Sequence, residues 1–312
     1  MKKITILVFG LCAIATIRGQ ENPFVDITPT GVVKKDFPAL KSIVYTVGFG
    51  MPSISSDLLP GDGIWDNNTG LAFQIGVDFR KQFTTERSMN NRVFDYPTLF
   101  AIGGGLGFSY FGQSSGLKLS EESINGNDKD NDEYIARLSY RDVKEQVSLL
   151  YLDIPLYLEI GKPSKTITRA WAKIGVKGSL LLNGNFKGEG QYASTGYYPK
   201  WDVELHDIPV LDYYPNKACY ENPEYKLNPF VLWGNLSAGV SIPLSNPEKY
   251  ILRNTILRIG LKYDFTLNTI SSGSSTDLYP GSNYRINQSN MLGGNGARLQ
   301  CFGLEIGLIS SL

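Results

Sequence analysis

Eight segments of the chain alternate large apolar side chains with polar or small ones, and no other feature constrains the fold as much. These segments occupy residues 43–51, 71–80, 100–110, 149–161, 171–180, 232–242, 257–267 and 301–308. In the fourth, "LLYLDIPLYLEIG", Leu or Ile recurs at every second residue, and the residues between them include Asp153 and Glu159. A period of two is the repeat of a β-strand whose two faces meet different surroundings. The sequence therefore predicts an all-β protein.

The connections between these segments alternate between long and short. Those after the first, third, fifth and seventh segments cover residues 52–69, 112–145, 185–229 and 268–297, whereas the others cover 84–96, 161–166 and 245–255. In an up-and-down meander every long loop then lies at the same end, which is typical of outer-membrane barrels. The predicted fold is an eight-stranded antiparallel up-and-down transmembrane β-barrel with four long extracellular loops, closed by pairing of the last strand with the first.

Glycine argues against a soluble sandwich or a lipocalin-like barrel, which also alternate. Such a protein would fill its water-facing side with Thr, Lys and Glu, but here that side carries Gly48, Gly50, Gly76, Gly103, Gly105, Gly107, Gly175, Gly239, Gly260, Gly303 and Gly307. Glycine weakens a strand unless something crowds the backbone. The narrow interior of an eight-stranded barrel supplies that crowding.

The first residues are predicted to direct export. Lys2 and Lys3 precede an apolar run over residues 4–17 and small or polar residues around Gly19, which is the arrangement of a secretory signal peptide. We expect a signal peptide over 1–19, a periplasmic arm over 20–41 and the barrel over 42–312, in the outer membrane of a Gram-negative bacterium. No later segment has 18 uninterrupted apolar residues, so no spanning helix is expected.

The charge balance gives no basis for nucleic-acid binding. Loss of Lys2, Lys3 and Arg18 with the signal peptide leaves 27 basic residues against 30 acidic ones, and a nucleic-acid-binding surface would need a basic excess. We expect outer-membrane lipid around the protein, no nucleic-acid partner, no cofactor and no metal.

The inward face of the predicted barrel carries five acidic and five basic residues, namely Asp78, Arg80, Asp153, Glu159, Lys173, Lys177, Arg258, Lys262, Asp264 and Glu305. Buried charges must be paired, because an isolated one costs several kcal/mol. The ten residues could form a salt-bridge network that fills the barrel or a hydrophilic conduction path. The interior of eight strands is just filled by side chains, which favours the network.

Pro155 lies on the same inward face as Asp153 and Glu159. Proline removes a ladder hydrogen bond and is normally confined to edges or bulges, and a closed barrel has no edge. We therefore expect a bulge or a local kink of the strand at Pro155.

The stretch "YLDIPLYLEIG" at residues 151–161, together with the signal peptide and the eight strands, resembles the PorT-like outer-membrane barrel family of Bacteroidota, which are OmpA-like eight-stranded barrels. The resemblance implies an outer-membrane location. The family includes accessory barrels of the type IX secretion machinery and many members of unknown role. One departure is Leu312 at the end of the chain, where many such barrels have an aromatic residue.

Two loop motifs are candidate sites for chemistry. His206 stands beside Asp207 in "WDVELHDIP", but no nucleophile motif accompanies the pair, so we expect no enzymatic activity. Asp128, Asp130 and Asp132 alternate as in a calcium loop, but the required glycine and distal glutamate are missing. A solvated acidic loop is the favoured interpretation there.

Cysteines and tyrosines of the long loops leave alternatives open. An oxidising compartment permits a disulfide between Cys219 and Cys301, and two free thiols are the alternative. The Tyr-Pro clusters at residues 197–199, 213–215 and 279–280 either bind a partner or pack the loops on the barrel mouth.

Three functions remain as hypotheses. The leading one is a non-enzymatic membrane anchor or interaction protein, an accessory of type IX secretion or envelope assembly that binds its partners through the loops or the N-terminal arm. The alternatives are a narrow porin-like channel for small solutes and a barrel enzyme that uses His206.

Overall fold

The computed structural model describes residues 40–56, 65–67, 70–84, 99–128, 130–163, 169–211, 213–220, 225–244, 255–272, 289–293 and 296–311. The chain divides into a unit over Met1–Phe37 and a unit over Pro38–Leu312, and all described residues belong to the second. The predicted signal peptide lies outside the described residues, as does nearly all of the predicted arm. Within the described part, no helix is long and apolar enough to cross a membrane.

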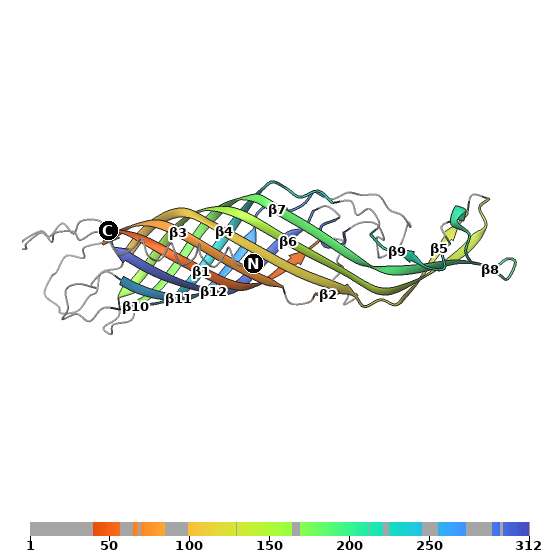
Figure 1. The fold of residues 1–312 in the computed structure, drawn as a ribbon, viewed down its shortest axis with the longest axis horizontal. Coiled ribbons are helices and arrows are strands. Elements are labelled where there is room, and N and C mark those ends of the chain that lie inside the picture. Colours follow the sequence, from red (N-terminus) through yellow and green to blue (C-terminus); the bar gives the residue numbers. More distant parts are fainter. Residues whose placement is uncertain are drawn as a thin grey trace, which may run out of the picture. The chain divides into compact units, whose positions relative to one another are not determined.

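Eight long antiparallel strands form a closed ring (Figure 1). In ring order they are β1 (Leu40–Ser55), β3 (Leu71–Thr84), β4 (Leu99–Leu117), β6 (Glu133–Pro163), β7 (Arg169–Tyr198), β10 (Phe230–Pro243), β11 (Thr255–Thr266) and β12 (Arg298–Ser311). The ring closes where β1 pairs with β12, from Ser42↔Ser311 to Ser55↔Arg298. The predicted eight-stranded up-and-down barrel is confirmed, and the predicted segments fall within these strands except for Leu267, one residue past the end of β11.

The register around the ring is staggered. A row of outward-facing partners starts at Lys41 and passes through Lys81, Ile102, Leu158, Ile174, Leu236, Tyr263 and Phe302 before it returns to β1 at Met51. One circuit therefore advances ten residues along β1. A stagger of this kind tilts the strands by about 40° from the barrel axis, so each row of side chains climbs as it goes round.

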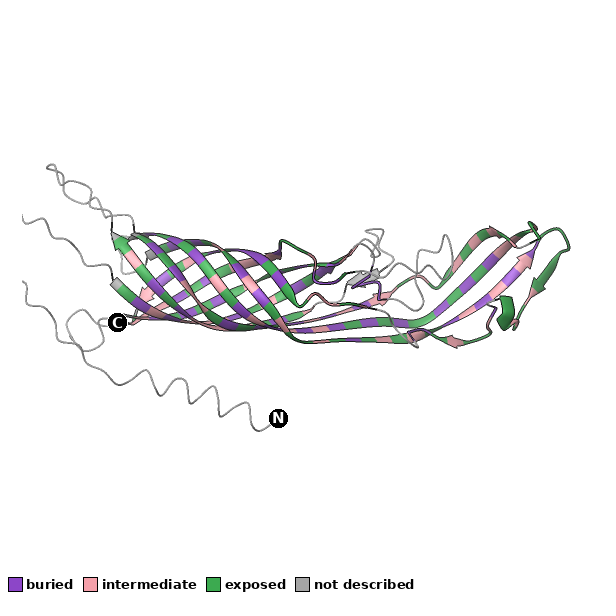
Figure 2. Ribbon diagram, turned by 90° about the horizontal axis from the view of Figure 1, so that it is seen from above, coloured by how far each residue is buried: buried purple, intermediate pink, exposed green. Residues whose placement is uncertain are grey.

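The two faces of the ring differ as the alternation predicts (Figure 2). Outward side chains are large and apolar, and Leu106, Leu156 and Ile174 are each more than half exposed. Inward side chains are polar or small. A water-soluble monomer rarely exposes an apolar surface this extensive, whereas hydrocarbon around a barrel covers it at no cost.

Beyond the barrel, β6 and β7 continue as a ribbon from Ser148↔Asn185 to Ile135↔Tyr197, and β4 stays paired with β6 as far as Gly116↔Lys144. Short strands flank it: β5 (Glu121–Asn127) on β6, and β8 (Val203–Leu205) and β9 (Lys217–Ala218) on β7. We call this ribbon with its flanking strands the outer sheet. β2 (Trp65–Asn67) pairs separately with the end of β4.

The outer sheet corrects the prediction that residues 112–145 and 185–229 are loops, because much of both ranges is strand. The physical reason is a change of environment at the barrel rim. Beyond it the polar side chains face outward, and apolar ones such as Val143, Val147 and Phe186 face a core formed by the connections. Bulges between Arg141 and Lys144 on β6 and opposite Leu150/Tyr151 on β7 adjust the register. At the first bulge Gly190 has a φ of 141°, and a Cβ there would lie 2.7 Å from the Cα of Val143.

Candidate functional site

Nine of the ten predicted interior charges are buried inside the barrel, and Lys262 is partly buried. Near the end with the short turns, Glu159 lies between two guanidinium groups. Its carboxylate is 2.8 Å from Arg80 Nη2 and 2.9 Å from Arg258 Nη1. Lys173 and Glu305 form a second pair at 2.8 Å. Each partner comes from a different strand, so these bonds cross-link the ring from within.

A second group of charges lies nearer the end with the long loops. Lys177 Nζ is 3.4 Å from Asp153 and 3.5 Å from Asp264, and Lys262 Nζ is 3.2 Å from Asp264. The hydroxyls of Ser109 and Ser179 donate to Asp153. Asp78 accepts a hydrogen bond from the Tyr157 side chain. The structure thus brings all ten predicted residues into one interior region.

Little space is left between these groups. A cavity of about 50 Å³ lies among them, lined in part by Asp78, Lys173 and Asn235. That volume holds roughly one or two water molecules. The buried Oδ1 of Asn235 has no protein partner and Asn235 lines this cavity, so such water could satisfy it. Among the described residues the interior is therefore filled by charged side chains, most of them ion-paired.

An aromatic layer closes this region toward the long loops. Phe111 and Trp233 stack with ring centroids 5.1 Å apart, and Tyr151 meets both edge-on at 6.1 Å. Lys177 Nζ lies 4.6 Å from the Trp233 ring, which joins the charged region to the aromatic one. Phe111 was missed because the predicted third strand stops before it, although extension of the same period would have placed it inside.

Above the aromatic layer lies an apolar core, the outer core, formed by the outer sheet and the connections. It includes Leu138, Val143, Val147, Leu149, Phe186, Tyr220, Ile270, Met291, Leu292 and Leu299. Buried in it is one carboxylate, Glu145, with no exposed surface. The position of Glu145 inside a predicted loop gave no signal of this burial.

Glu145 collects hydrogen bonds from two different connections. The Tyr220 hydroxyl donates to it at 2.7 Å and the Ser289 hydroxyl at 3.3 Å. The backbone N–H groups of Asn290 and Met291 donate at 2.8 Å, and the Asn290 amide at 2.9 Å. Burial nevertheless raises the pKa of the Glu145 carboxyl above its ordinary value. A single side chain of β6 therefore fastens two connections over the barrel mouth.

Pro155 interrupts one ladder without a register shift, so of the two alternatives expected there, a bulge or a local kink, the bulge is absent. Its pairing with β7 passes through Pro155↔Lys177 with no shift, and the pairing with β4 stops at Gly104 and resumes in the same register at Gly107. The gap in the ladder follows from the N–H that proline lacks. Glycines of β4 permit the close approach, since a Cβ on Gly104 would lie 2.9 Å from the Pro155 carbonyl oxygen.

The disulfide considered between Cys219 and Cys301 is not formed, and both cysteines are buried. The register separates them. Cys301 is level with Asp264, Asn235 and Gly175 inside the barrel, whereas the Cys219 N–H bonds to Gly190, far along β7 in the outer sheet. A disulfide requires Cα atoms within about 7 Å.

The two candidate loop motifs lie among the described residues. His206 is exposed, and its nearest charged partner is Glu204 at 3.8 Å. The Asp128 carboxylate accepts from the N–H groups of Asp130 and Asp132 and so shapes a turn, and no metal-ligand cluster occurs among the described residues.

In two of the Tyr-Pro clusters one tyrosine, Tyr198 or Tyr213, is buried and packs within the loops, while Tyr197 and Tyr214 are partly exposed. The cluster at 279–280 lies outside the described residues.

The far end of the outer sheet exposes apolar side chains that the loops do not cover. Val210 is 92% exposed and Trp201 51%, with Val203 and Leu211 also exposed. Trp201 stands beside Tyr198 and under the Lys200 ammonium, 4.7 Å from its ring. We call these four residues, Trp201, Val203, Val210 and Leu211, the tip patch.

Comparison with known proteins adds the following. The sequence model of the family described as outer membrane protein beta-barrel domain matches residues 40–272. No curated protein matches the chain. Among solved structures, the chain is similar to Neisserial surface protein A, with 11% identity, 86% of this chain and 97% of that chain covered, and a TM-score of 0.30. It is also similar to Ail of Yersinia pestis, solved with the heparin analogue sucrose octasulfate, with 8% identity, coverages of 87% and 99%, and a TM-score of 0.25.

Proposed function

Because the chain belongs to the outer membrane protein beta-barrel family, we propose that this integral outer-membrane protein is a non-enzymatic anchor that presents the outer sheet to partner proteins. The long loops of such barrels are extracellular, so the outer sheet projects from the cell surface. The observation that carries the proposal is the tip patch at its far end, with Val210 92% exposed.

The tip patch is built on a supported surface. The β8 strand, which carries Val203 of the patch, pairs with β7, and Arg137 bridges to Glu204 at 3.2 Å. Lys200 bridges to Asp132 at 2.7 Å across the ribbon. Rigid aromatic and aliphatic side chains exposed on a fixed frame bind partners at low entropic cost.

The filled interior weighs against the channel. Conduction needs a continuous polar path, and the cavity among the charges is only about 50 Å³ below the layer formed by Phe111, Trp233 and Tyr151. We expect no conductance steps in planar bilayers. Steps that disappear on Lys173→Gln or Asp153→Asn would favour the channel instead.

Site-specific crosslinking in intact cells tests the anchor proposal. A photoreactive residue at Val210 should capture other proteins, whereas the same residue at Asn185, exposed on the ribbon outside the tip patch, should capture none. Mass spectrometry of the products identifies the partners. Secretion or envelope-assembly components would support the narrower role of a type IX secretion accessory that the resemblance suggests. Recovery of the barrel alone from both positions would contradict the anchor proposal.

A further inference from the structure

Two lysines face each other on the outer surface of the barrel at its periplasmic end. Lys41 of β1 pairs directly with Lys81 of β3, and both side chains are exposed on the side that faces lipid. Like charges directly opposite one another across a strand pair are destabilising. Neither lysine takes part in an ion pair among the described residues. Some anion from outside the chain would remove this repulsion.

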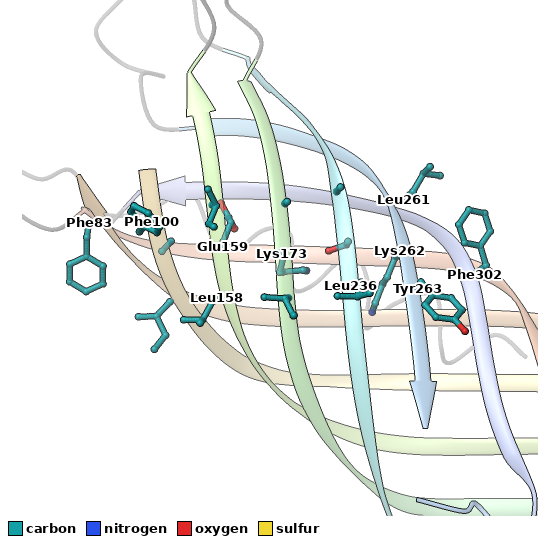
Figure 3. A pocket seen from close by; sticks show the side chains of 17 residues that line it. Phe83, Phe100, Leu158, Glu159, Lys173, Leu236, Leu261, Lys262, Tyr263 and Phe302 are labelled. Atoms are coloured by element: carbon teal, nitrogen blue, oxygen red, sulfur yellow. The ribbon is translucent and has the colours of Figure 1, made fainter. Parts of the chain in front are cut away.

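The lysines stand at the start of an apolar groove. Lys81 Nζ lies 5.2 Å from the ring centroid of Phe83, and Phe83 lines a depression of about 780 Å³ on the outer surface. Lys81 is also the register partner of Ile102, another lining residue. Figure 3 shows the groove from Phe83 and Phe100 at one end to Tyr263 and Phe302 at the other.

The groove exists because small residues interrupt the apolar surface. Ala172 and Ala238 are register partners on adjacent strands, and larger side chains, such as Ile160, Ile174 and Leu236, stand around them. Since the rows climb around the ring, the groove rises from the periplasmic lysines toward the middle of the membrane. Its apolar walls suit a hydrocarbon chain.

We propose that this surface binds one anionic glycerophospholipid of the periplasmic leaflet. The phosphate lies between the ammonium groups of Lys41 and Lys81, and one acyl chain lies along the groove past Phe83 and Phe100 to the Ala172–Ala238 depression. Lysine side chains at this depth reach the headgroup level. The groove continues the surface that lipid already covers, and the two positive charges select the anionic headgroup. This inference is independent of the protein partner proposed above.

Electron paramagnetic resonance of spin-labelled lipids with the full-length protein in vesicles tests the proposal. The wild type should immobilise phosphatidylglycerol in preference to phosphatidylcholine, by about fivefold for each lysine. Lys41→Gln with Lys81→Gln should abolish the preference. The matched control is Lys144→Gln with Lys187→Gln, since both of these lysines are exposed in the outer sheet beyond the lipid-facing surface, and the preference should not change.

A second variant tests the groove separately from the charges. Ala238→Phe fills the depression and should reduce the immobilised lipid while phosphatidylglycerol remains preferred. Equal immobilisation of both lipids by the wild type, or a preference that survives loss of both lysines, would overturn the proposal.

Discussion

Inside the barrel, Glu159 lies between the guanidinium groups of Arg80 and Arg258, whereas Glu145 in the outer core is held by neutral donors of Tyr220 and residues 289–291. In the barrel interior, opposite charges on different strands compensate one another, and the closed ring fixes the positions of those strands. The outer core has no such frame for its connections. There, the Glu145 carboxylate accepts hydrogen bonds from several backbone and side-chain donors. A carboxylate therefore holds loops together in the outer core, whereas in the barrel interior it holds strands together.

The largest expected effect comes from removing the interior carboxylate. Glu159→Gln leaves two buried guanidinium groups facing each other, and loss of one partner of a buried ion pair costs about 3–5 kcal/mol. We expect the urea concentration that unfolds the protein in vesicles to fall sharply. Glu159→Gln combined with Arg80→Gln should recover part of the lost stability. If Glu159→Gln alone were as stable as the wild type, Glu159 would not be compensating the two guanidinium charges.

Glu145→Ala should act on the outer core alone. It leaves several buried donors without their acceptor, at about 1–3 kcal/mol for an unsatisfied group, and should release the segment that contains Asn290 and Met291. Hydrogen exchange at those two amides should accelerate while heat-dependent gel migration of the barrel stays unchanged. Glu145→Gln, which keeps one acceptor oxygen, should show a smaller effect. Unfolding of the barrel in parallel with the loop would show that the two regions are one cooperative unit.

The same carboxylate makes the outer core sensitive to pH. Burial raises the pKa of Glu145 above its ordinary 4.5, so the folded state binds the proton more tightly than the unfolded chain does. Its contribution to stability is complete below pH 4.5 and is lost as the pH rises through the folded pKa. Protection of the Asn290 and Met291 amides, corrected for intrinsic exchange, should decrease over that range. In Glu145→Gln this dependence should vanish, and a pH dependence that persists would assign it to another group.

The smallest effect is expected at an exposed pair on the ribbon. Lys187 and Glu189 form an ion pair with side chains more than half exposed, where solvent screens the attraction. Lys187→Gln should change neither barrel unfolding nor loop exchange measurably. A clear loss of stability would mean that exposed charges of the ribbon contribute as the interior ones do.

Sequence alone predicted the barrel because the ring keeps two contrasting environments along each strand. Asp153 and Glu159 could be placed inside from parity, and so could their basic counterparts, because every strand carried the same contrast. The outer sheet was not predicted, because the contrast between the two faces is lost at the barrel rim. Leu149 faces the outer core and Leu150 belongs to the opposite face, so both faces are apolar in the sequence there. The partners of Glu145 could not be predicted, since Tyr220 and Asn290 lie in other connections and are brought to it only by tertiary structure.

The pairing of β1 with β12 has a consequence for assembly. These strands come from opposite ends of the barrel sequence and share a ladder from Ser42↔Ser311 to Ser55↔Arg298. A chain that lacks β12 would have two open strand edges in hydrocarbon, where each unsatisfied backbone group costs several kcal/mol. Insertion cannot therefore proceed hairpin by hairpin through stable intermediates. Entry into the bilayer and closure of the ring are expected as one concerted event, which waits until the final strand has been delivered to the membrane.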